Sequence, residues 1–187
     1  CVLGRGGGSP RDDGKAAAAG LAGPDNPRSH RVGLLKVRRR IPPLIAVPTT
    51  AGTGSETTIA AVVTGSDHHK YAISDLCLIP RYAILDPALT VGLPPHITAE
   101  TGMDALTHAV EAYTCREATP YTDALAIEAI RLVGRSLRRA VADGCDMQAR
   151  TEMCWADYMA GRASSTRGSG RGHRRAHPHH PPEHKPH

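Results

Sequence analysis

The chain has 187 residues, enough for one large domain or two small ones, and it contains no Phe and only 3% aromatic residues. A hydrophobic core must therefore be built mainly from Ala, Val, Leu and Ile. The formal net charge of +5 arises after residue 161, because residues 1–161 hold seventeen basic and seventeen acidic side chains, and a basic stretch without interleaved aromatic residues argues against nucleic acid as a partner.

The five cysteines form no C-x-x-C pair and no framework typical of secreted proteins. No apolar run is long enough for a signal peptide or a membrane span, so we expect a reduced, cytoplasmic setting and no membrane partner. The sequence begins at Cys1 rather than Met and reaches its first motif within five residues. We interpret it as a fragment of a longer protein.

The first part of the chain is typical of an α/β segment. A glycine turn at residues 6–8 precedes residues 15–19 (KAAAA), which have high helix propensity, and residues 20–42 form a connector rich in Gly, Pro and Arg. Residues 44–47 (LIAV) are all apolar and are followed by Pro48, the pattern of a buried parallel strand.

Three more short strands are expected. Residues 60–63 and 71–73 form a hairpin across a polar connection, and residues 82–85 form a strand ended by Asp86. The patterns up to this point predict a partial nucleotide-binding α/β domain over residues 1–87.

A helical domain is predicted over residues 88–161, with three helices. The first carries an apolar stripe made of Met103, Leu106, Val110 and Tyr113. The second is capped by Thr122 or Asp123, runs to about Ala142 and stops at Gly144. The third is capped by Asp146 and carries Met153, Trp155 and Met159.

The character of the sequence changes at Arg162. Only Ala163 and Ala176 are apolar among the last twenty-six residues, so this segment buries too little surface to offset the entropy of ordering it. We predict that residues 162–187 form a basic, His-rich tail that is disordered when it stands alone.

Two glycine-rich segments could meet a nucleotide. In the first, Gly6, Gly7, Gly8 and Ser9 form a turn before a helix, where backbone N–H groups and the helix N-terminus attract a phosphate. In the second, residues 48–56 (PTTAGTGSE) offer four hydroxyl groups to a ribose, an amide or a phosphate. Taken alone, each segment is equally compatible with a tight polar turn.

Asp104 and His108 are candidate metal ligands. They are four residues apart on a predicted helix, which places both side chains on one face, one turn apart. The alternative is an ordinary surface hydrogen bond or salt bridge between the two side chains.

Four motifs in a fixed order resemble those of the iron-containing (group III) alcohol dehydrogenases. They are GGGSPRDDGK from Gly6, PLIAVPTTAGTGSETT at residues 43–58, AILDPALTVGLPP at residues 83–95, and the Asp104/His108 helix. The resemblance covers nearly the whole chain and is strong over residues 43–161. It implies a dehydroquinate synthase-like fold, in which an α/β nucleotide-binding domain precedes an all-α domain, and an enzyme that uses NAD or NADP and a metal ion on a small alcohol or aldehyde. It also implies a homo-oligomer in the intact protein.

The resemblance assigns the glycine turn to the nucleotide pyrophosphate, with Asp12 and Lys15 also at family positions, and it assigns the second loop to the same cofactor. The cofactor-binding residues that it implies are Gly7, Gly8, Ser9, Asp12, Thr49, Thr50, Thr53, Ser55 and Lys70. Arg5 stands where the family has an apolar strand residue, so a strand before the turn is in doubt.

The family binds its metal through the helix Asp and His and two later histidines. When the chain is aligned with the family pattern without gaps, the resemblance implies Asp104, His108, His173 and His187 as these ligands. It also implies that His177 takes the place of a catalytic His near the nicotinamide. An oxygen and three imidazoles suit Fe(II) or Zn(II), which would activate the alcohol as a Lewis acid. Six of the fifteen residues from His173 to His187 are His, so the alternative is a tract that binds metals loosely.

Three interpretations remain open from the sequence. The first is a fragment of a primary alcohol dehydrogenase, inactive alone because the strand before the glycine turn lacks its sheet neighbours. The second is a metal-independent reductase relative with the same fold. The third is a catalytically dead fragment whose His-rich tail binds metal.

Overall fold

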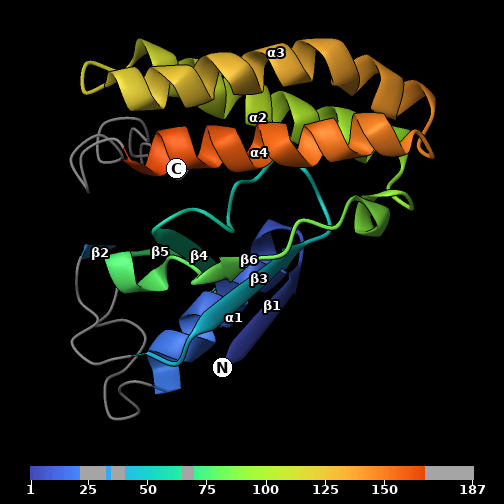
Figure 1. Cartoon of the computed structure of the whole chain (residues 1–187). Helices are drawn as coiled ribbons and strands as arrows, with labels where there is room; N and C mark the ends of the chain where they lie inside the picture. The colour runs from blue at the N-terminus through green and yellow to red at the C-terminus, as the bar shows by residue number, and fades with distance from the viewer. Residues whose placement is uncertain (22–32, 35–40, 65–69, 167–187) are drawn as a thin grey trace, which may run out of the picture.

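The computed structural model describes residues 1–21, 33–34, 41–64 and 70–166, and it arranges them as an α/β part beneath a bundle of three helices (Figure 1). In the α/β part, β1 (Val2–Gly6), β3 (Leu44–Pro48) and β6 (Tyr82–Ala83) form a parallel sheet in the order β1-β3-β6. Helix α1 (Gly8–Leu21) packs against this sheet. The predicted α/β fold class is confirmed.

The buried parallel strand predicted at residues 44–47 is confirmed as β3. The doubt about the preceding strand was wrong, because β1 pairs with β3 along all five of its residues while Arg5 points to solvent. The expectation that β1 lacks sheet neighbours is corrected by the same pairing. The strand expected at residues 82–85 is shorter than predicted, since β6 keeps only two residues.

A second sheet contains the predicted hairpin. β4 (Ala60–Thr64) and β5 (Lys70–Ser74) pair antiparallel, and β2 (Gly33–Leu34) adds to β5 in parallel. The short 3-10 helix η2 (Leu76–Leu78) connects β5 to β6, and a second one, η3 (Pro87–Thr90), lies between β6 and the bundle.

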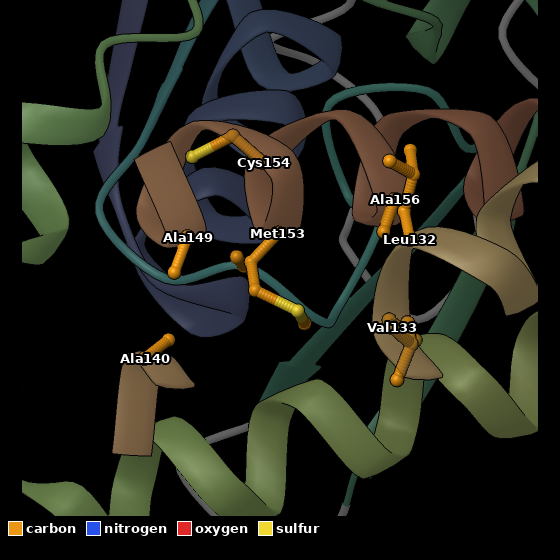
Figure 2. Packing of buried hydrophobic residues seen from close by; sticks show 9 residues of the cluster. Leu132, Val133, Ala140, Ala149, Met153, Cys154 and Ala156 are labelled. Atoms are coloured by element: carbon orange, nitrogen blue, oxygen red, sulfur yellow. The ribbon is translucent and has the colours of Figure 1, made fainter. Parts of the chain in front are cut away.

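The bundle consists of α2 (Pro95–Thr114), α3 (Pro120–Ala142) and α4 (Met147–Thr166). Its core is built in thin layers of alanine, as in the cluster formed by Ala112, Ala126 and Ala163. The largest cluster joins residues of α3 and α4, among them Val133, Ala140 and Met153 (Figure 2), with Ala105 of α2 and Ala51 of the loop after β3. None of the described helices is both long and apolar enough to cross a membrane.

The apolar stripe predicted on α2 was wrong for three of its four residues. Met103, Val110 and Tyr113 are 51%, 43% and 48% exposed, and Leu106 is half-buried. The buried face of α2 carries small residues instead, namely Thr98, Gly102, Ala105, Ala109 and Ala112. The helices approach so closely that a Cβ on Gly102 would lie 2.2 Å from a methyl carbon of Leu137, and large side chains do not fit this interface.

The predicted helix caps are partly corrected. Thr119 caps α3, with Thr122 completing a reciprocal capping box from inside the helix. Asp146 caps α4 as predicted, since its carboxylate accepts a hydrogen bond from the Ala149 N–H at 2.9 Å. Trp155, on the same helix, is 47% exposed.

The boundary predicted at Arg162 lies inside a helix. Helix α4 continues to Thr166, and Ala163 is fully buried against α2 and α3. The remainder of the predicted tail, residues 167–187, lies outside the described residues.

The loop between β3 and β4 joins the two parts of the molecule. A Cβ on Gly52 would lie 1.9 Å from the backbone carbonyl oxygen of Thr101 in α2, and a Cβ on Gly161 of α4 would lie 3.1 Å from the Cα of Gly54. Gly54 has a φ of +59°, which glycine adopts without strain. The loop therefore lies in backbone contact with two helices of the bundle.

This contact predicts a large difference between two Gly→Ala substitutions. Gly52→Ala should lower the free energy of unfolding by at least about 3 kcal/mol, because the new methyl group meets helix backbone that cannot move aside. Gly134→Ala, on an exposed turn of α3 where a Cβ has no neighbour within 4 Å, should raise it by about 0.5–1 kcal/mol. Urea unfolding of both variants and the parent measures the difference. Equal free energies of unfolding for the two variants would contradict the contact between the Gly52 loop and α2.

Candidate functional site

The structure brings the two predicted nucleotide loops together. β1 and β3 are parallel neighbours, so the loops that follow them leave the same edge of the sheet. The Thr49 N–H donates to the carbonyl oxygen of Gly6 at 3.1 Å, and a Cβ on Gly8 would lie 3.3 Å from the methyl carbon of Thr53. Residues of the glycine turn and of the loop after β3 therefore lie next to each other at the N-terminus of α1.

The glycine turn has no room for a side chain at Gly6. Gly6 has a φ of +143°, and a Cβ there would lie 2.8 Å from the ring of Pro10. Helix α1 begins at Gly8, two residues later. The partial positive charge of a helix N-terminus therefore lies beside Gly7 and Gly8, which favours an anionic ligand.

Thr50 adds an unpartnered polar group at the same place. Its hydroxyl oxygen is buried and has no hydrogen-bond partner among the described residues. A Cβ on Gly7 would lie 3.7 Å from this oxygen. Buried hydroxyl groups are normally hydrogen-bonded, so this one is available to a polar ligand.

Asp12, Lys15 and Ser55 make their contacts within the protein. The buried Lys15 ammonium donates to the carbonyl oxygens of Thr58 and Ala60 at 3.0 and 2.8 Å. Asp12 accepts from the Ser55 hydroxyl at 2.7 Å and from the Val62 N–H at 3.1 Å. These side chains fasten the loop after β3 onto α1, and the roles of Asp12 and Ser55 toward a cofactor stay predictions.

Burial lowers the pKa of Lys15 to about 8, against which the nearby Asp12 carboxylate acts. Burial likewise raises the pKa of the Cys77 and Cys154 thiols to about 12. Both thiols are therefore protonated at neutral pH, which disfavours nucleophilic attack by either one.

A buried ionic cluster at the centre of the site was missed from the sequence. The Arg11 guanidinium forms an ion pair with Glu56, and the two side chains are 1% and 0% exposed. Arg11 also donates to the Gly7 carbonyl oxygen at 3.0 Å and to the Thr53 hydroxyl at 2.5 Å. One side chain thus contacts both predicted loops.

Asp157 joins this cluster from α4. Its carboxylate accepts from the backbone N–H of Gly54 at 2.8 Å and from that of Gly52. Burial raises the pKa of Asp157 well above its ordinary value, and the charge of Glu56 raises it further. The spacing of Asp157, four residues from both Met153 and Gly161 on the buried face of α4, is the one signal that could have revealed it.

The predicted metal-binding pair lies on the outer side of α2. The imidazole Nε2 of His108 is 3.7 Å from a carboxylate oxygen of Asp104, with side chains 30% and 48% exposed. Among the described residues, no three His, Cys, Asp or Glu side chains are grouped to hold a metal ion. His173, His177 and His187 lie outside the described residues.

Ser9 is exposed near the start of α1, Thr49 is half-buried after β3, and Lys70 opens β5. Their predicted roles toward the cofactor stay predictions.

Two family models match the chain in succession. Residues 1–87 match iron-containing alcohol dehydrogenase, and residues 98–187 match the C-terminal part of the Fe-containing alcohol dehydrogenase family. Together they span both the α/β part and the helical bundle.

Individual relatives agree with these matches. The chain is 49% identical over 170 residues to the probable alcohol dehydrogenase EutG of Salmonella typhimurium, covering 90% of this chain and 43% of the relative. It is 45% identical to the NAD-dependent methanol dehydrogenase of Bacillus methanolicus, covering 88% and 43%. The solved alcohol dehydrogenase from Oenococcus oeni superposes with a TM-score of 0.84 at 42% identity, covering 90% and 44%. The chain therefore spans less than half the length of these relatives.

The buried Lys15 generates a prediction about pH. Its folded pKa of about 8 lies below the value of about 10.4 in an unfolded chain, so the unfolded state binds more protons between these values. The part of the stability that depends on the ionisation of Lys15 is complete above about pH 10.4 and is lost as the pH falls from there through about 8. We expect the free energy of unfolding of the parent to rise with pH between about 8 and 10.4. In the Lys15→Met variant this rise should be absent.

Lys15→Met should also unfold more easily at pH 7, by about 2 kcal/mol, because the carbonyl groups of Thr58 and Ala60 lose their donor. Arg131→Met, whose side chain is 73% exposed, is the control. Urea unfolding from pH 7 to 10.5 and an NMR titration of the lysine side-chain carbons measure both effects. A Lys15 that titrates near pH 10.5 would refute the buried assignment.

Proposed function

Because the chain belongs to the iron-containing alcohol dehydrogenase family, we propose that the protein interconverts a primary alcohol and its aldehyde by hydride transfer with NAD or NADP. The observation that carries the proposal is the meeting of the glycine turn and the loop after β3 at the N-terminus of α1. There the hydroxyl oxygen of Thr50 is buried without a hydrogen-bond partner among the described residues. Gly7 and Gly8 have no side chains that would obstruct their backbone N–H groups.

The nucleotide fits this place by its chemistry. Its pyrophosphate would be held by the N–H groups of Gly7, Gly8 and Ser9, where the dipole of α1 favours negative charge. Thr49, Thr50 and Thr53 would offer hydroxyl groups from the other loop, and Lys70 a cation from β5. When bound, the nicotinamide supplies the hydride acceptor for alcohol oxidation.

The metal ion would be held by Asp104 and His108 together with His173 and His187. A carboxylate oxygen and imidazole nitrogens form a donor set that suits Fe(II) or Zn(II), and Asp104 and His108 lie one turn apart on a partly exposed face of α2. Such an ion acts as a Lewis acid that lowers the pKa of an alcohol hydroxyl group. We place His177 next to the nicotinamide as a catalytic residue.

The residues of the chain would set the geometry of the transfer. The two loops orient the nucleotide, and α4 holds the second loop through Asp157. The loop and the metal-binding helix therefore share one rigid frame, because Gly52 lies against α2 at Thr101, one turn before Asp104. Hydride transfer depends on such fixed placement of donor and acceptor.

The nucleotide site predicts that Gly7→Val weakens cofactor binding without unfolding the protein. A Cβ at Gly7 has only ordinary contacts, 3.6 Å from the Thr50 methyl carbon, but a valine side chain fills the space in front of the unpartnered hydroxyl. We expect the Kd for NADH to rise at least about tenfold, or about 1.4 kcal/mol. Fluorescence titration measures it, with Gly92→Ala, whose Cβ has no neighbour within 4 Å, as the control. Unchanged affinity of the valine variant would remove Gly7 from the site.

The metal site predicts that His108→Ala loses bound metal, because the four ligands form one site. His96→Ala, an exposed histidine in the first turn of the same helix, should keep it. Metal analysis after Fe(II) or Zn(II) loading and gel filtration compares the two variants with the parent.

A truncation distinguishes the four-ligand site from the competing interpretation, in which the His-rich tail binds metal by itself. The deletion removes residues 167–187 and keeps Ala163, which is buried in the bundle. If His108→Ala retains full metal while the truncation loses it, His108 does not belong to the site and the tail binds the ion alone.

A further inference from the structure

Arg11 is a cation buried inside the nucleotide site whose bonds all go to the protein. Its Nε donates to the Gly7 carbonyl oxygen at 3.0 Å, one terminal nitrogen donates to the Thr53 hydroxyl at 2.5 Å, and the other pairs with the Glu56 carboxylate. The side chain is 1% exposed. It is therefore shielded from a ligand, and its charge is already paired with Glu56.

The three bonds reach two segments that are distant in sequence. Gly7 belongs to the turn after β1, whereas Thr53 and Glu56 belong to the loop after β3. The planar fork of a guanidinium fixes the direction of each bond. The distance between the Gly7 backbone and Thr53 is thereby set by the size of one rigid group.

Thr53 is held from two sides. Its hydroxyl oxygen accepts from Arg11, and the N–H groups of its neighbours Gly52 and Gly54 donate to the Asp157 carboxylate of α4. The Thr53 methyl carbon then lies 3.3 Å from where a Gly8 Cβ would be. Arg11 on one side and the helical bundle on the other therefore determine the position of the loop after β3 relative to the glycine turn.

We propose that Arg11, anchored by Glu56, is a positioning residue that fixes the separation of the two nucleotide loops and thereby sets the affinity of the site for the nucleotide. This inference rests on the proposed function, since it assumes that the loops bind NAD or NADP. Arg11 acts through Gly7 and Thr53 and does not touch the cofactor. Glu56 holds the guanidinium in place, and its second carboxylate oxygen is buried without a partner in the described residues.

The first test is Arg11→Lys, which keeps the charge and loses the fork. We expect the Kd for NADH to rise about tenfold, because one ammonium group cannot bond Gly7, Thr53 and Glu56 in their present directions. Arg131→Lys, on the exposed face of α3, is the matched control and should bind as the parent does. Affinity equal to that of the parent in the Arg11→Lys protein would overturn the proposal.

A double variant separates positioning from stability. Arg11→Met alone leaves Glu56 buried and unpaired, so its Tm should fall by about 10 °C. Adding Glu56→Gln removes that charge and should restore most of the Tm, but it restores neither the bond to Gly7 nor the bond to Thr53. We expect the Kd to remain raised about tenfold in the double variant. Recovery of affinity together with Tm would show that Arg11 only stabilises the fold.

A third measurement does not need the nucleotide. The proximity of Gly8 and the Thr53 methyl group should give a nuclear Overhauser effect between the Gly8 Hα and Thr53 methyl protons in the parent and in Arg131→Lys. We expect its loss in the Arg11→Met/Glu56→Gln protein, and its persistence there would refute the positioning role. If the parent shows this effect yet binds no NADH, the proposed function fails while the role of Arg11 in loop spacing stands.

Discussion

The architecture depends on one backbone contact, in which the loop after β3 lies directly on the helical bundle. Gly52 leaves no room for a side chain against the Thr101 carbonyl oxygen of α2, and Gly161 of α4 lies against Gly54. The Asp157 carboxylate accepts hydrogen bonds from two backbone N–H groups of the same loop. The loop that carries the candidate nucleotide ligands is consequently also the joint between the α/β part and the helices, so its shape cannot change without moving both.

This joint is polar and buried, which has energetic consequences. Burying a guanidinium and two carboxyl groups is costly unless they are paired and hydrogen-bonded. Arg11 and Glu56 form an ion pair, and burial, followed by the charge of Glu56, raises the pKa of Asp157 above its ordinary value. The cluster contributes little net stability by itself, and its main effect is to specify a single arrangement of the two loops.

The bundle solves a different problem, that of packing helices without aromatic side chains. Its core uses alanine layers such as Ala109, Ala129 and Ala160, which let the helix axes approach closely. Met103 and Val110, two of the larger apolar side chains of α2, are left exposed.

Sequence patterns alone predicted β3, the hairpin of β4 and β5, the three helices of the bundle, the Asp146 cap and the family, because each depends on neighbouring residues or on motifs of fixed spacing. They also indicated both glycine-rich loops, although not how these loops meet. Only the tertiary structure decided the buried face of α2, since helical periodicity cannot show whether large or small residues face a close neighbour. Only it paired Arg11 with Glu56 and Asp157 with Gly54, which are 45 and 103 residues apart, because contacts between distant segments are set by packing and leave no periodic trace in the chain.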